Sequence, residues 1–145
     1  MTDESPDKKF VLFVCIGNMC RSQMAEGFAR SMGNDIVEAF SAGTHHTGVV
    51  SEKAIAVMEE RGIDISRQRS KGLKDVPLLD MDYIINMATS SADDVCPPHY
   101  SGERLVWLVL DPIGESQECF ESVRDDIEKR VKGLLQSIWK GHPAS

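Results

Sequence analysis

The order of apolar and polar residues predicts a strand, a sharp turn and a helix near the start of this chain. Residues 10–16 form an apolar run that is too short for a helix and is rich in Val and Phe, which predicts a buried parallel strand over 9–16. Gly17 and Asn18 follow, and both tolerate the positive φ angles of a tight turn. Apolar residues then recur at helical spacing over 22–32. Cys15 is therefore expected at the end of a strand, with the next helix pointing its N-terminus back at it.

The rest of the chain continues this alternation. Three further apolar runs predict strands at 36–41, 81–88 and 105–110, with a turn at 42–43 and with Asp111-Pro112 ending the last strand. Helices are predicted at 51–61 and from about 116 to near 140, with shorter ones at 73–79 and 90–93. The longest helix has an apolar stripe and opposite-charge pairs on its other face: Phe120, Val123, Ile127, Val131, Leu134 and Ile138, with Asp125/Lys129, Asp126/Arg130 and Glu128/Lys132. The pattern predicts a three-layer α/β/α fold with a four-stranded parallel sheet.

Length, charge and cysteine content limit the class of protein. With 145 residues, we expect a flexible N-terminus at 1–8, one catalytic domain at 9–141 and a tail at 142–145. The net charge of −7 argues against nucleic acid or an anionic membrane as the main partner. No apolar run approaches the roughly 20 residues of a membrane span, and no signal peptide is recognisable. Reduced thiols are the natural state of four cysteines without an export signal, so we expect a cytoplasmic monomer.

The sequence Cys15-x5-Arg21-Ser22 combines a nucleophile with an anion-binding loop. A loop between a strand and a helix directs several backbone N–H groups and the helix dipole at one place, which suits a tetrahedral oxyanion. The planar guanidinium of Arg21 matches two oxygens of such an anion. The same positive field favours the thiolate of Cys15, to which Ser22 can donate its hydroxyl. The expected oxyanion ligands are Ile16, Gly17, Asn18, Met19, Cys20, Arg21 and Ser22.

Asp111 is expected near Cys15 although the two are far apart in the sequence. The carboxyl ends of parallel strands meet at one edge of a sheet, and ligands bind there. Cys15 follows the first predicted strand and Asp111 follows the fourth. A carboxyl group at this place can give a proton to a leaving oxygen and later act as a base toward water. We therefore interpret Asp111 as the general acid.

These motifs resemble a known family. The stretch VLFVCIGNMCRSQMAEG is similar to the signature loop of the low-molecular-weight protein tyrosine phosphatases and of the arsenate reductases that share their fold. The segments FSAGTHHTG, GIDISRQRSKGL and LDP extend the similarity over nearly the whole chain after residue 9. The resemblance implies a phosphotyrosine phosphatase I-like fold with flavodoxin-like topology. It also implies Cys15 as the nucleophile, Arg21 and the loop amides as oxyanion ligands, and Asn18 as the residue that holds the loop in shape.

Two departures from the phosphatases favour the arsenate reductases. An aromatic pair typically follows Asp-Pro in those phosphatases and lines the slot for a phosphotyrosine ring, whereas Ile113 and Gly114 stand there in this chain. Their loop usually reads SPMAE, whereas this chain has SQMAE, as the reductases do. The leading hypothesis is reduction of arsenate to arsenite. The alternatives are hydrolysis of phosphotyrosine or aryl phosphates through a phosphocysteine, and a binding module that holds phosphate or a partner without turnover.

The cysteines leave the thiol relay open. The thioredoxin-coupled reductases use a nucleophile and two further thiols after the third strand. Cys96 matches the second of these, but Thr89 stands at the first and cannot form a disulfide. Cys96 or Cys20 could attack the Cys15 adduct, or an external thiol such as glutathione or mycothiol could do so. Thioredoxin, glutathione or mycothiol would then supply electrons, with no bound cofactor.

No metal site is expected. Several of the reductases bind potassium through an Asn, a Glu, a Ser and an Asp. Asn18, Glu26 and Ser41 match this set, but Lys71 stands at the Asp position, where its ammonium can replace the cation. The adjacent histidines at 45–46 lie in a polar segment and are expected to be solvated.

Overall fold

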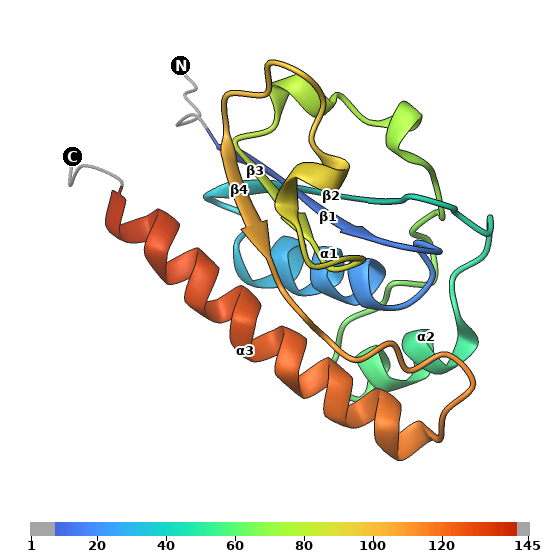
Figure 1. The fold of residues 1–145 in the computed structure, drawn as a ribbon. Helices are drawn as coiled ribbons and strands as arrows, with labels where there is room; N and C mark the ends of the chain where they lie inside the picture. Colours follow the sequence, from blue (N-terminus) through green and yellow to red (C-terminus); the bar gives the residue numbers. More distant parts are fainter. Residues whose placement is uncertain (1–7, 142–145) are drawn as a thin grey trace.

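The computed structural model describes residues 8–141 and has a four-stranded parallel sheet at its centre (Figure 1). The strands are β1 (Lys9–Cys15), β2 (Val37–Gly43), β3 (Tyr83–Asn86) and β4 (Glu103–Val106), in the spatial order β2-β1-β3-β4. The α-helices are α1 (Arg21–Met32), α2 (Glu52–Glu59) and α3 (Gln117–Gly141). The predicted α/β fold around a four-stranded parallel sheet is confirmed. Residues 1–7 of the predicted flexible N-terminus and the tail at 142–145 lie outside the described residues.

The side chains of β1 alternate between two apolar layers. Phe13 and Cys15 belong to the core that α1, α2 and α3 cover, whereas Leu12 and Val14 belong to a second cluster on the other face. That second face is covered by three short 3₁₀ helices, η1 (Leu73–Asp75), η2 (Leu78–Asp80) and η3 (Ala92–Val95). The helix predicted at 73–79 is therefore two turns separated near Pro77. The 90–93 helix starts later than predicted, and the Ser91 side chain does not cap it.

The longest helix, α3, packs against α1 and α2 as its sequence pattern predicts (Figure 1). Its apolar stripe is buried throughout, and two of the three predicted ion pairs form: Phe120, Val123, Ile127, Val131, Leu134 and Ile138, with Asp126–Arg130 and Glu128–Lys132. Asp125 pairs with Arg61 and Arg124 rather than with Lys129, because the buried Arg124 lies between α2 and α3. Within residues 8–141, no helix is both long and apolar enough to cross a membrane.

The predicted turn at 42–43 is wrong. Ala42 and Gly43 continue β2, because they pair with Val14 and Cys15 at the end of β1. The longer strand brings Gly43 next to the loop that follows β1. A Cβ on Gly43 would lie 2.6 Å from the carbonyl oxygen of Ile16, so the strand can approach the following loop this closely only with glycine at position 43.

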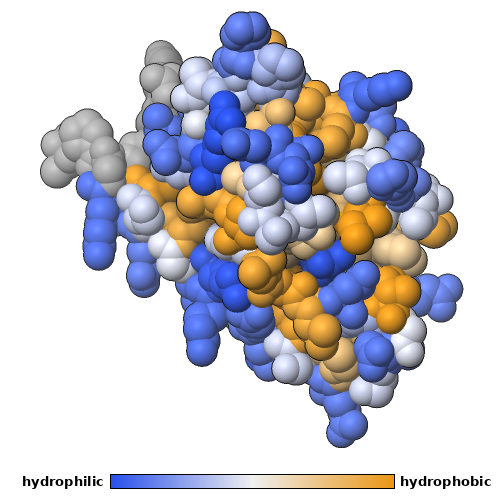
Figure 2. All heavy atoms as spheres, viewed as in Figure 1, coloured by the Kyte–Doolittle hydropathy of each residue, from blue (hydrophilic) through white to orange (hydrophobic). Residues whose placement is uncertain are grey.

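The predicted boundaries of the fourth strand are also wrong. β4 covers 103–106 rather than 105–110, and it lies at the edge of the sheet with one neighbour. The ladder ends where the Trp107 N–H donates to the Asn86 carbonyl oxygen. Leu108 and Leu110 are 67% and 65% exposed, and apolar side chains appear on this face of the molecule where the segment crosses it (Figure 2). The segment after β4 is therefore a loop, and this loop carries Asp111.

Candidate active site

The loop of residues 16–20 connects β1 to α1 and is fastened along one side by the segment after β2. Backbone N–H groups of that segment donate to loop carbonyls. The bonds run from Thr44 to Cys15 (3.0 Å), from His45 to Ile16 (2.8 Å), from Thr47 to Gly17 (3.0 Å) and from Ser51 to Met19 (2.9 Å). The remaining carbonyl, that of Asn18, accepts from the Gln23 side chain at 3.1 Å. Every carbonyl of residues 15–19 is thus bonded to a group beyond the loop.

This fastening determines where the loop N–H groups point. In a trans peptide the N–H is directed opposite to the carbonyl that precedes it. The N–H groups of residues 16–20 are therefore turned away from the groups that hold the carbonyls. Among the described residues, these N–H groups have no carbonyl or side-chain partner. The N-terminus of α1, where Cys20 provides no side-chain cap, lies directly behind them and adds its dipole. The arrangement is an anion-binding loop of backbone donors.

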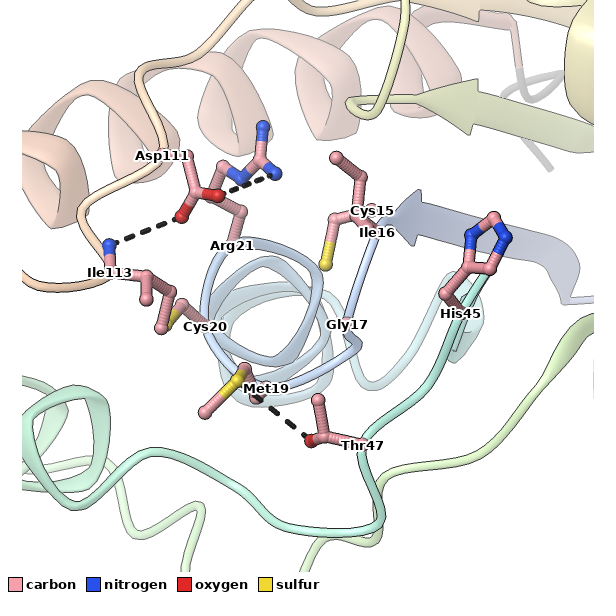
Figure 3. A pocket seen from close by; sticks show the side chains of 10 residues that line it. All are labelled: Cys15, Ile16, Gly17, Met19, Cys20, Arg21, His45, Thr47, Asp111 and Ile113. Carbon is pink, nitrogen blue, oxygen red and sulfur yellow. Dashed lines mark hydrogen bonds and ion pairs between the residues drawn. The ribbon is translucent and has the colours of Figure 1, made fainter.

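The Cys15 sulfur lies at the start of this loop and contacts a hydroxyl. Cys15 Sγ is 2.8 Å from Ser22 Oγ, and the Asn18 side-chain amide donates to the same hydroxyl at 2.8 Å. Asn18 has a φ of 50°, in the left-handed region that Asn tolerates better than most residues. Its place between loop and helix agrees with its expected role in holding the loop in shape. The sulfur faces the cavity in Figure 3.

Arg21 and Asp111 lie on the other side of the cavity (Figure 3). Arg21 is buried, and its Nη1 donates to the carbonyl oxygens of Met87 (2.7 Å) and Val109 (3.3 Å). Its Nη2 is 3.5 Å from Asp111 Oδ2, while Asp111 Oδ1 accepts from the Ile113 N–H at 3.1 Å. The structure therefore brings Asp111 to the edge of the sheet where Cys15 lies, as the topology predicts. A loop rather than the end of a strand carries it there.

The cavity is small and has no aromatic wall. Its volume is about 200 Å³, below the roughly 300 Å³ at which pockets for drug-sized ligands begin. Its lining contains no Phe, Tyr or Trp and consists of Cys15, Ile16, Gly17, Met19, Cys20, Arg21, His45, Thr47, Asp111 and Ile113. His45 and Thr47 line the cavity although the sequence pattern does not predict them as site residues. Their position just after β2, at the same edge as Cys15, is the signal that could have found them.

The two other cysteines of the expected relay lie in different places. Cys20 is buried and lines the cavity, and burial raises the pKa of its thiol to about 12 although a hydrogen bond with Ser51 opposes the shift. Cys96 follows η3 and packs against the cluster of Leu12 and Val14, on the other face of the sheet. Its Sγ donates to the Ala92 carbonyl oxygen at 3.2 Å, and burial also raises the pKa of Cys96. The structure brings Cys20, and not Cys96, into the cavity.

The Lys71 ammonium lies among the residues of the expected cation position. Its Nζ is 3.4 Å from Ser41 Oγ and 3.7 Å from Glu26 Oε1, and it donates to the Arg69 carbonyl oxygen at 3.0 Å. Burial lowers the pKa of Lys71, and the Glu26 carboxylate counteracts this. The backbone N–H of Lys71 donates to Asn18 Oδ1 at 2.8 Å, so the same residue also contacts the anion-binding loop. In residues 8–141, no cluster of three or more His, Cys, Asp or Glu side chains could hold a metal ion.

Comparison with known proteins agrees with this geometry. The family described as low molecular weight phosphotyrosine protein phosphatase matches residues 10–143. A glutaredoxin arsenate reductase of Synechocystis sp. is 39% identical over 132 residues, which are 90% of this chain and 98% of that protein. A solved arsenate reductase in a phosphate-binding state has a TM-score of 0.79 at 39% identity, with 90% of this chain and 98% of that chain covered. A thioredoxin-dependent arsenate reductase of Corynebacterium glutamicum has a TM-score of 0.78 at 28% identity, with 93% and 64% covered. The chain therefore belongs to the low molecular weight phosphotyrosine protein phosphatase family.

Proposed function

We propose that this chain is an arsenate reductase that converts arsenate to arsenite through the Cys15 thiolate, with residues 9–141 as its catalytic domain. The observation that carries the proposal is the set of N–H groups at 16–20 that have no partner within residues 8–141 and lie beside the Cys15 sulfur. Such a loop holds a tetrahedral oxyanion with its central atom next to the nucleophile. The similar proteins at 39% sequence identity are arsenate reductases, which favours arsenic as the central atom of the oxyanion.

The first step forms a sulfur–arsenic bond. The Cys15 thiolate attacks arsenic in H₂AsO₄⁻, an arsenic–oxygen bond breaks, and the departing hydroxyl takes one proton and leaves as water. Arg21 and the loop amides neutralise the charge on the remaining oxygens. The proton can come from Asp111, which lies beside Arg21 at the mouth of the cavity. The product is a Cys15–arsenate thioester-like adduct that still contains arsenic(V).

The second step is the reduction. Another thiolate attacks the Cys15 sulfur, a disulfide forms, and the electron pair of the sulfur–arsenic bond stays on arsenic, which leaves as arsenite. Cys20 is the thiol already in the cavity, whereas Cys96 would have to move from the other face of the sheet. An external thiol can also perform the attack. Thioredoxin, glutaredoxin with glutathione, or mycothiol then reduces the disulfide with two electrons, which suits a reducing compartment such as the cytoplasm.

A phosphatase is the second candidate function, and the Arg21–Asp111 pair favours it. Hydrolysis of a phosphoester needs a proton for the leaving oxygen and a base for the attacking water, and we assign both tasks to Asp111, which lines the cavity. The rim of the cavity opposes a phosphotyrosine substrate, because Ile113 and Thr47 lie there instead of aromatic side chains that would stack on a phenol ring. Small aryl phosphates remain compatible with the site.

A paired assay tests the proposal. Purified protein is given para-nitrophenyl phosphate in one series, and arsenate with thioredoxin, glutathione or mycothiol in the other. We expect arsenite formation with at least one thiol system and much weaker phosphatase turnover. Efficient phosphatase turnover without arsenite in any thiol system would assign the chain to the second function.

A further inference from the structure

Gln23 is a buried residue of α1 whose side chain lies behind the anion-binding loop and does not line the cavity. It has no exposed surface. The two protons on its Nε2 face three acceptors, so one proton is shared: the carbonyl oxygens of Asn18 (3.1 Å) and Arg69 (2.9 Å) and Asn18 Oδ1 (2.9 Å). Its Oε1 accepts from Gln68 Nε2 at 2.7 Å. The two backbone carbonyls establish which end of the Gln23 amide is the nitrogen, because an oxygen there would face two other oxygens.

The bond from Gln23 and the bond from the Lys71 backbone N–H together determine the orientation of the Asn18 amide. Asn18 Oδ1 accepts from Gln23 Nε2 and from the Lys71 backbone N–H, so it needs two donors around it. The NH₂ end of Asn18 must then face Ser22, and it donates to Ser22 Oγ at 2.8 Å. A hydroxyl has one proton. Since Ser22 Oγ accepts from Asn18, its proton is available for the Cys15 sulfur 2.8 Å away.

Gln23 holds the backbone of the loop as well. Among the carbonyls of residues 15–19, that of Asn18 is the one that accepts from the Gln23 side chain and not from a backbone N–H of the segment after β2. That bond sets the plane of the peptide between Asn18 and Met19, and with it the direction of the Met19 N–H. One buried amide therefore controls both a donor for the oxyanion and the hydroxyl donor for the nucleophile.

We propose that Gln23 is a positioning residue that makes Ser22 donate its proton to the Cys15 thiolate. This inference rests on the proposed function in that it takes Cys15 as the nucleophile. If the amide of Asn18 turned over, Ser22 would donate to Asn18 Oδ1 and the sulfur would lose its hydroxyl donor. Hydrogen bonds to charged groups are among the stronger ones, so the loss makes the thiolate form about tenfold less favoured.

The titratable groups around the Cys15 sulfur come from three parts of the chain. Cys20 and Arg21 lie on the loop and α1, His45 follows β2, and Asp111 lies on the loop before α3. A neutral replacement at position 23 changes none of these charges. Gln23→Met is therefore the suitable variant, since it nearly keeps the shape of glutamine, removes the amide and adds no charge.

The test is a double-mutant cycle of Gln23→Met and Ser22→Ala. The rate of Cys15 alkylation by iodoacetamide is measured from pH 5 to pH 9, with the labelled cysteine identified by mass spectrometry. We expect Ser22→Ala to lower the rate at pH 6 about tenfold and to move the profile to higher pH. Gln23→Met should lower the rate at pH 6 several-fold and also move the profile to higher pH. The rate and profile of the double variant should match those of Ser22→Ala alone.

Met58→Ala is the control for general loss of stability. Met58 is fully buried near α1 and lacks a polar group, so this variant lowers the melting temperature without altering the bonds around Asn18. Its alkylation profile should match the wild type. An unchanged profile in Gln23→Met, or an effect of Gln23→Met that persists in full in the Ser22→Ala background, would overturn the inference. A wild-type profile like that of a free thiol would instead refute the proposed function itself.

Discussion

The Arg21 guanidinium and the Asp111 carboxylate lie 3.5 Å apart at the cavity that the Cys15 sulfur faces. Arg21 is held by carbonyl oxygens from two separate segments, at Met87 and Val109, so its guanidinium has a fixed place. Asp111 is half exposed and belongs to a loop. The pair therefore joins a rigid anion-binding group to a proton-transferring group that solvent can reach, and the two should differ in their importance for the two candidate reactions.

Asp111→Asn should separate those reactions. A phosphoester has a poor leaving group that needs a proton, so hydrolysis of para-nitrophenyl phosphate should fall about 10²- to 10³-fold. Loss of water from arsenate is easier, and arsenate reduction should fall less than about tenfold. Initial rates with both substrates check this. Asp126→Asn, on the exposed face of α3, is the matched control, and an equal loss of both activities would show that Asp111 has no specific role in protonating the leaving group.

Cysteine variants should identify the second thiol. Cys15→Ser should abolish arsenite formation and phosphatase turnover alike, because a hydroxyl is a far weaker nucleophile than a thiolate. If Cys20 attacks the adduct, Cys20→Ser lowers arsenate turnover at least tenfold and Cys96→Ser has little effect. If Cys96 moves to the site, the two variants exchange behaviour. Assays of arsenite release decide between them, and full turnover in both variants would leave an external thiol as the attacking group.

Alkylation should be selective among the cysteines. Burial raises the pKa of the Cys20 thiol to about 12, so little Cys20 thiolate is present from pH 6 to pH 9 although Cys20 lines the cavity, and any attack by Cys20 on the Cys15 adduct requires that it first lose its proton. Cys15 should therefore be labelled by iodoacetamide well before Cys20, as mass spectrometry of digests would show. Labelling of Cys20 at a comparable rate at pH 7 would contradict the inferred environment of its thiol.

Arg124→Met should weaken the contact between α2 and α3. Arg124 is 5% exposed and donates to the Val57 carbonyl oxygen, Glu60 and Asp125. Its removal should lower the free energy of unfolding by about 1–3 kcal/mol at pH 7. Arg130→Met, which breaks an exposed pair on the same helix, should cost less than about 1 kcal/mol. Urea unfolding of both variants measures the difference. Similar losses of unfolding free energy in both would contradict the inference that Arg124 stabilises the contact between α2 and α3.

The contacts of Arg124 with Glu60 and Asp125 should make part of the folding stability depend on pH. Hydrogen bonds from Arg124 hold the pKa values of the Glu60 and Asp125 carboxyls below their usual range. Because these pKa values are lower in the folded chain, their stabilisation is present above the ordinary values and is lost as the pH falls through the folded ones. The gap in stability between wild type and Arg124→Met should therefore narrow below about pH 4. A difference in stability that stays constant down to pH 3 would show that the Glu60 and Asp125 carboxyls contribute nothing to the effect of Arg124.

Local patterns were sufficient to predict the first strand, the first helix and the long C-terminal helix. Their periodicity is strong, and Cys15-x5-Arg21 lies between two such elements, so the nucleophile and its loop could be placed from the sequence. Ala42 and Gly43 were predicted as a turn because glycine interrupts a pattern, but pairing with β1 extends the strand. The run after Val106 was predicted as a buried strand because it is apolar, although it lies beyond an edge strand and exposes Leu108 and Leu110.

The part of the site that the sequence does not predict consists mainly of polar contacts between distant segments. Nothing in the local sequence shows that Gln23 contacts Asn18 and Arg69, or that Lys71 reaches Glu26 and Ser41. Apart from Gln23–Asn18, these contacts join residues 30 to 46 positions apart, and they become visible only once the loop after α2 packs against α1. A buried polar side chain needs partners, but the sequence does not say which ones.

The most direct test of the account is protection of Cys15 from alkylation by oxyanions. Iodoacetamide labelling is followed at pH 6, where a free thiol with a pKa of about 8.5 is almost wholly protonated, in the absence and presence of millimolar phosphate or arsenate, with sulfate and chloride in parallel samples. We predict labelling of Cys15 much faster than that of glutathione, and slowing of that labelling by phosphate and arsenate as they fill the loop, beyond any slowing by chloride; sulfate is itself a tetrahedral oxyanion and is a competitor for the loop, so chloride alone reports the effect of ionic strength. Labelling no faster than that of glutathione, with no protection by either oxyanion, would contradict the account.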